Sequence, residues 1–232
     1  MSSDYFDKPT EGYRIDKFLI LSKDGKVLHR QNASELLKQV NREGYDALEM
    51  THFNSFYQIP EITGPAPDYI KERNFILNSK RVGIFIVSAD LKKVLHFRRI
   101  KSSADHQVHD AQILPNGHLI YFNNTHVPDE EGKNNYSTIE ELDLNSEKMV
   151  FEFKAEPKGS FYSRHCGGVQ RIDEDRVLFS HMLTGTYLFS QKKKDFQSHM
   201  FQTHLGEGGR FFPSQQVKAM DLRSFLSHWK SN

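Results

Sequence analysis

The amino-acid sequence predicts an all-β fold of the β-propeller type. Short apolar or alternating runs recur along the chain with turn residues between them, few segments have a helical pattern, and one pattern built around a glutamine occurs three times. Successive strands without intervening helices are typical of sandwiches, barrels and propellers. The internal repeat favours the propeller, and the chain has room for about four to five blades.

Eight segments carry the strand prediction. Each has the length of an ordinary strand and is bounded by glycine, asparagine, aspartate or lysine turns. They are residues 17–22, 75–79, 83–88, 118–124, 138–144, 149–155, 176–180 and 185–190.

A repeat built around a glutamine favours a propeller. Gln58, Gln112 and Gln170 lie 54 and 58 residues apart, and an apolar residue, a turn and a strand follow each of them. A second pattern, two strands joined by a lysine-containing turn, occurs at 22–30, 88–97 and 143–153. Repeats of about 40 to 50 residues with four strands each are typical of propeller blades.

Two amphipathic helices interrupt this pattern. Asn32 can cap the first, with Glu35 at the third helical position and Gly44 at its end. Near the C-terminus, Leu222, Phe225, Leu226 and Trp229 have the spacing of one helical face. We therefore expect an N-terminal tail over 1–14, a propeller-like domain over 15–205, and a C-terminal segment over 206–232 whose helix packs on the body.

The composition and the termini of the sequence limit the classes of binding partner and cofactor. The net charge of +1 indicates no nucleic-acid surface, and no run is long and apolar enough for a membrane span. The first residues lack the pattern of a signal peptide, which predicts a cytoplasmic protein as the sequence stands, or a periplasmic or secreted one if residues precede Met1. The single Cys166 excludes an internal disulfide. We expect no cofactor, and no metal, because no histidine or cysteine motif has metal-ligand spacing.

Histidines and arginines precede or end several predicted strands at equivalent places. They are His52 with Asn54, His109 with Asp110, Arg164 with His165, and His181. The innermost strand of each blade lines the centre of a propeller, so these side chains are expected to converge on one funnel. Guanidinium and imidazole groups together suit a small anion.

The pair His109-Asp110 has two interpretations. It stands directly before a β-hairpin whose turn is Pro115-Asn116-Gly117. The pair can be a catalytic acid/base with Asp110 orienting the ring, or Asp110 can accept hydrogen bonds from backbone amides and hold a corner of the fold. The residues alone leave both open.

At these motifs the chain resembles a known family. The segments THFNSFYQIP, HDAQILPNGHLIYFNN and FYSRHCGGVQ follow in order the pattern of arylsulfotransferase-like β-propellers, over residues 15–200. The resemblance implies a funnel-shaped propeller that moves a sulfuryl group between phenols without a nucleotide donor, through a transiently sulfated histidine. By position, His52, Arg81 and His109 match the residues that hold or transfer the sulfate.

The chain departs from the family at two places. Thr138 stands where the family has an arginine, and no histidine lies near Thr186, where the nucleophile is expected. His181 is then the best remaining nucleophile. We expect a propeller that binds a small aryl sulfate or similar anion, with sulfuryl transfer as the finer prediction. The alternative is a scaffold for a protein partner, with the basic run 191–196 and the polar loop 124–136 as contact surfaces.

Overall fold

A computed structural model of the chain provides the structure. For strand residues 2–3, 105–106, 181, 185–186 and 195–199 it describes the backbone only. The described residues are 2–3, 16–40, 52–79, 82–99, 105–127, 134–155, 157, 159–163, 166–181, 185–192 and 195–199.

Three antiparallel sheets of four strands make up most of the described part of the chain, and each is a blade in which strands follow one another in chain order. Blade 1 contains β4 (Phe53–Gln58), β5 (Phe75–Ser79), β6 (Gly83–Val87) and β7 (Val94–Arg98). Blade 2 contains β8 (Asp105–Ile113), β9 (Leu119–His126), β10 (Tyr136–Asp143) and β11 (Lys148–Lys154). Blade 3 contains β12 (Gly168–Arg171), β13 (Arg176–His181), β14 (Gly185–Ser190) and β15 (Asp195–His199).

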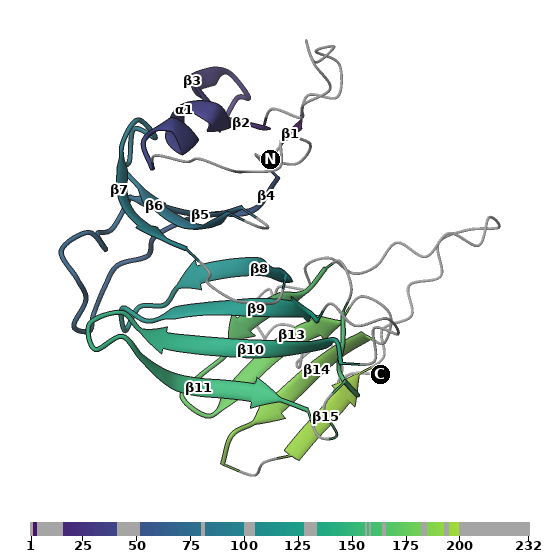
Figure 1. Cartoon of the computed structure of the whole chain (residues 1–232). Coiled ribbons are helices and arrows are strands. Elements are labelled where there is room, and N and C mark those ends of the chain that lie inside the picture. The colour runs from purple at the N-terminus through teal and green to yellow at the C-terminus, as the bar shows by residue number, and fades with distance from the viewer. Residues whose placement is uncertain are drawn as a thin grey trace.

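A smaller sheet precedes blade 1. This N-terminal sheet has the order β1-β2-β3, with β1 (Ser2–Ser3), β2 (Asp16–Leu21) and β3 (Val27–Asn32). The helix α1 (Ala33–Lys38) follows it. Figure 1 shows the N-terminal sheet, blade 1, blade 2 and blade 3 arranged one after another. Four antiparallel sheets stacked in chain order form an all-β, propeller-like fold, as the sequence predicts.

Each interface between neighbouring sheets has its own apolar core. The alternation of side chains along β9 shows this, because Leu119 and Tyr121 face blade 1 whereas Ile120 and Phe122 face blade 3. This double burial explains why the run LIYF is apolar without interruption. Phe18, Leu36, Phe53, Leu77 and Phe85 form the core between the N-terminal sheet and blade 1.

The second repeat pattern is a turn that recurs between the outer strands of different sheets. In the N-terminal sheet the Ser22 hydroxyl donates to Asp24 Oδ1 at 2.5 Å and accepts from the Lys26 amide at 3.0 Å. In blade 1, Ser88 makes the same two bonds with Asp90 and the Lys93 amide, at 2.5 and 3.0 Å. The β2–β3 hairpin is therefore equivalent to the outer hairpin β6–β7 of a complete blade.

The predicted strands agree closely with the observed ones, and the three glutamines lie on the first strands of the three blades, β4, β8 and β12. The predicted N-terminal helix is present but shorter, and Asn32 at its N-cap makes no side-chain capping bond. The strands β1, β4, β8, β12 and β15 are not among the predicted segments, and β1 lies within the predicted N-terminal tail. The predicted C-terminal helix and the segment 206–232 lie outside the described residues.

Candidate functional site

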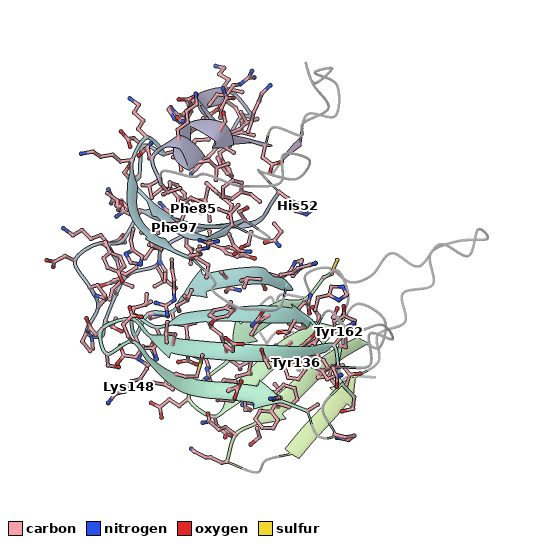
Figure 2. All side chains as sticks on the ribbon, in the orientation of Figure 1. His52, Phe85, Phe97, Tyr136, Lys148 and Tyr162 are labelled. Carbon is pink, nitrogen blue, oxygen red and sulfur yellow. The ribbon has the colours of Figure 1, made fainter. Side chains whose placement is uncertain are left out.

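The first strands of the blades all start at one end of the molecule, which we call the entrance end. The second strands β5, β9 and β13 finish there, because they pair antiparallel with β4, β8 and β12. Figure 2 shows His52, Tyr136 and Tyr162 toward this end, on the right in that view. His52 and Asn54 lie at the start of β4, and the backbone of His181 lies at the end of β13.

Four of the eight predicted site residues have described side chains. They are His52, Asn54, His109 and Asp110. Arg81, Arg164 and His165 lie outside the described residues, as does the side chain of His181. The structure brings Asn54 into contact with His109, whereas the Asp110 carboxylate bonds to Tyr57 and Val169. His52 is partly buried, two residues before Asn54 on the chain.

Asp110 joins three blades through its carboxylate. The Tyr57 hydroxyl of β4 donates to Oδ1, and the Val169 amide of β12 donates to Oδ2 at 2.8 Å. Asp110 itself belongs to β8 and is only 5% exposed. Charge-assisted hydrogen bonds of this kind are among the stronger ones in proteins. The carboxylate therefore connects blade 1, blade 2 and blade 3 at one point.

A local irregularity of β8 determines the direction in which the Asp110 carboxylate points. The register between β8 and β9 shifts between His109 and Gln112, which is a β-bulge. Asp110 has a φ of 52°, in the left-handed region that aspartate tolerates better than most residues. Bulges redirect side chains out of the ordinary alternation. The Asp110 carboxylate thus reaches both neighbouring blades. In a regular strand it would point to one face of the sheet only.

Gln112 extends the connection to blade 3. Its side-chain amide donates to the Val169 carbonyl at 2.7 Å. Asp110 and Gln112 together therefore hold both backbone polar groups of Val169. The pattern H-D-x-Q is an interblade clamp, and its hydrogen bonds support the structural interpretation of Asp110.

The pKa of Tyr57 supports the same role. Burial of the ring raises it most, and the negative charge of Asp110 and the hydrogen bond to it raise it further. The phenol therefore stays protonated and remains a donor to the carboxylate. Sequence analysis missed Tyr57, although it directly precedes Gln58 of the repeat.

His109 is held in the interface between blade 1 and blade 2. The Asn54 side-chain amide contacts His109 Nδ1 at 3.0 Å and donates to the Val108 carbonyl at 2.8 Å. Because the amide nitrogen is a donor, Nδ1 acts as the acceptor, and the neutral ring carries its proton on Nε2. The residue is 7% exposed. Asn54 thus fixes both the position and the tautomer of the ring.

Asn78 completes this network. Its amide donates to Asn54 Oδ1 and to the Val108 carbonyl, both at 2.6 Å. The signal for Asn78 in the sequence is a polar residue directly after the apolar run FIL of a predicted strand, because a buried polar side chain is more informative than a buried apolar one.

A second polar network lies at the entrance end of blade 2. The Tyr162 hydroxyl contacts His126 Nε2 at 3.0 Å, and His126 Nδ1 contacts Asn135 Oδ1 at 3.2 Å. Nearby, the Asn124 amide donates to the Cys166 carbonyl at 3.4 Å. These contacts join the end of β9 and the start of β10 to the segment that leads into β12.

Gly167 lies where this segment passes blade 2. A Cβ atom at this position would lie 2.4 Å from Cδ1 of Phe122. No residue with a side chain fits there without displacing the ring. Glycine at this point therefore permits a close approach of the backbone to blade 2.

Within the described part of the chain, no group of three or more histidine, cysteine, aspartate or glutamate residues is placed to hold a metal ion. The same part contains no helix with the length and apolar character needed to cross a membrane.

The chain has a weak similarity to a solved structure. No family model and no curated protein matches the chain. Among solved structures, apo AztD from Citrobacter koseri is similar at 10% sequence identity with a TM-score of 0.29. The match covers 80% of this chain and 56% of that one, so the chain spans little more than half the length of that structure. Likeness at this level supports no functional argument, and the fold assignment depends on the sheets themselves.

Proposed function

We propose that the protein binds a small anion of the aryl sulfate class at the entrance end, and that His109 and Asp110 hold the blades in place without transferring a sulfuryl group. The observation that carries the proposal is that strand ends from all three blades lie at the same end of the molecule. His52 directly precedes β4, His126 ends β9, and the backbone of His181 ends β13, all at this end. The imidazole groups of His52 and His181 suit an anionic ligand, whereas both ring nitrogens of His126 already contact Asn135 and Tyr162.

Residues near Arg81, Arg164 and His165 in the sequence lie at the entrance end. Ser79, which precedes Lys80 and Arg81, is the last residue of β5. Ser163 and Cys166, on either side of Arg164 and His165, contact Ser137 and Asn124 at the start of β10 and near the end of β9. The proposal therefore assigns ligand binding to this end of the blades.

The geometry of His109 and Asp110 argues against transfer by this pair. Each Asp110 oxygen accepts a hydrogen bond from a neighbouring blade, and Nδ1 of His109 accepts one from Asn54. Both residues are less than one tenth exposed. A nucleophile or a proton carrier has to reach its substrate. The pair therefore acts on ligand binding only indirectly, through the positions of the blades.

The test is titration with 4-nitrophenyl sulfate, followed by calorimetry for binding and by absorbance for release of 4-nitrophenol in the presence of phenol. We expect saturable binding without release. His52→Ala should weaken binding by about tenfold, the loss of one good hydrogen bond to a charged ligand. His29→Ala, on the outer strand β3, is the matched control and should bind as the wild type does.

Binding that survives His52→Ala unchanged would place the ligand elsewhere. Release of nitrophenol, with a gain of one sulfuryl group in the intact mass of the protein, would contradict the non-catalytic part of the proposal.

A second candidate function is a scaffold for a protein partner. One observation favours it: apolar side chains are exposed at equivalent positions after the turns into the outer strands. They are Val27 and Leu28 on β3, Leu95 on β7, and Met149 and Val150 on β11. If the wild type does not bind the aryl sulfate, this function is the one that the fold supports.

A further inference from the structure

Two neighbouring polar atoms in the interface between blades 1 and 2 have no hydrogen-bond partner among the residues that the structure describes. They are Ser55 Oγ on β4 and Asn78 Oδ1 on β5. Ser55 is 1% exposed and Asn78 is not exposed at all. Buried polar atoms without a partner are rare in folded proteins, and an ordered water molecule is a common explanation.

The orientation of Asn78 shows which kind of ligand its oxygen requires. Its amide nitrogen donates to Asn54 Oδ1 and to the Val108 carbonyl, both at 2.6 Å. Rotating the amide would point its oxygen at two other acceptors, so the observed orientation is the stable one. Asn78 Oδ1 consequently needs a hydrogen-bond donor. An anion, which offers only acceptors, does not satisfy it.

Ser55 and Asn78 are direct cross-strand partners in the β4–β5 pair. Side chains of such partners emerge on the same face of the sheet, with Cβ atoms about 4.5 to 5.5 Å apart. A single oxygen atom can bridge two side chains at that separation. The Ser55 hydroxyl can donate or accept, so it suits a bridging molecule of either orientation.

We propose that Ser55 and Asn78 bind one ordered water molecule between blades 1 and 2. The water donates one hydrogen bond to Asn78 Oδ1 and makes a second with Ser55 Oγ. It thereby extends the network that runs from Asn78 through Asn54 to His109.

The chain offers a matched control in Ser79. Its hydroxyl is equally buried, at 1% exposure, and also has no partner within the described residues. Ser79 pairs with Phe53, and both face the apolar core between blade 1 and the N-terminal sheet. A buried water needs two to four polar partners. Phe53 and Leu77 beside Ser79 are apolar, and Asp16 Oδ2 already accepts from the Phe53 amide at 2.7 Å, so we assign no water to Ser79.

The experiment compares Ser55→Ala with Ser79→Ala in the full-length chain. If Ser55 holds a water, Ser55→Ala removes a satisfied hydrogen bond and should lower the thermal midpoint by about 2 to 4 °C. Ser79→Ala removes an unsatisfied hydroxyl and should leave the midpoint unchanged or raise it. A midpoint of Ser55→Ala at or above that of the wild type would overturn the proposal.

Magnetic relaxation dispersion of water ¹⁷O provides the second measurement, because it detects long-lived internal water directly. We expect the dispersion amplitude to fall by one water molecule in Ser55→Ala and to stay at the wild-type value in Ser79→Ala. An unchanged amplitude in Ser55→Ala would also overturn the proposal, whatever the thermal midpoint.

Discussion

Asp110 receives hydrogen bonds from opposite directions, which distinguishes it from a catalytic aspartate that orients a histidine. Its donors are Tyr57 and the amide of Val169, which lie 53 and 59 residues away in the sequence. From the sequence alone, His109-Asp110 fits an acid/base pair as well as a structural corner. The distinction depends on donors from two other blades, which no local pattern contains. This is why the residue type could be predicted and its role could not.

The role of Asn54 leads to a prediction about the tautomer of His109. At a pH where the ring is neutral, Nδ1 should be unprotonated and Nε2 protonated, because Nδ1 accepts from Asn54. Asn54→Ala should abolish this preference. Long-range ¹H–¹⁵N correlation spectra of the imidazole give the measurement. Asn116→Ala, beside His118 in the exposed β8–β9 turn, is the control and should leave His109 unchanged. Protonation of Nδ1 in the wild type would show the assignment to be wrong.

At the scale of elements, the strands of high apolar content were the most predictable. FILNS and GTYLFS were predicted with the bounds that β5 and β14 have. β15 (DFQSH) was missed because it has no apolar alternation, and its extended form depends on pairing with β14. α1 ends early, at Lys38, where the chain turns to contact blade 1 through Gln39 and the Val94 amide, at 2.9 Å. Tertiary contacts therefore decided what local propensity left open.

The interface between blades 2 and 3 contains an ion pair that sequence patterns did not indicate. Glu141 on β10 accepts from Arg171 on β12, at 2.8 Å from Nε, and contacts His118 Nδ1 at 2.8 Å. The guanidinium also stacks 4.7 Å from the centre of the Phe151 ring. The side chains of Glu141 and Arg171 are 5% and 13% exposed. A buried pair of this kind stabilises the interface only while both partners are present.

This pair predicts an asymmetric response to mutation. Arg171→Met leaves the Glu141 charge buried and should lower the free energy of unfolding by about 3 to 5 kcal/mol. The double variant Arg171→Met with Glu141→Leu should recover most of that loss. Arg176→Met breaks the exposed pair with Asp173 and should cost about 1 kcal/mol or less. Denaturant titration measures all three. A double variant no more stable than Arg171→Met alone would contradict the account.

At the scale of the whole molecule, the repeat correctly predicted sheets of propeller type, because each blade is a local unit of four consecutive strands. The three glutamines marked the first strand of each blade. How the blades join was beyond the sequence, since the clamp connects Tyr57, Asp110 and Val169 across three sheets. The candidate site was predictable as a set of strand ends, whereas the assignment of Asp110 to the clamp required the structure.

The most direct test of the clamp is a double-mutant cycle between Tyr57→Phe and Asp110→Gly, with unfolding followed by denaturant titration. Glycine removes the carboxylate and accepts the left-handed φ of this position. The cycle cancels the effect of glycine on the unfolded chain and should give a coupling of about 1.5 to 3 kcal/mol, the range for a hydrogen bond to a charged group. Tyr121→Phe, whose hydroxyl donates to Glu140, should be additive with Asp110→Gly. Additive effects of Tyr57→Phe and Asp110→Gly would contradict the clamp.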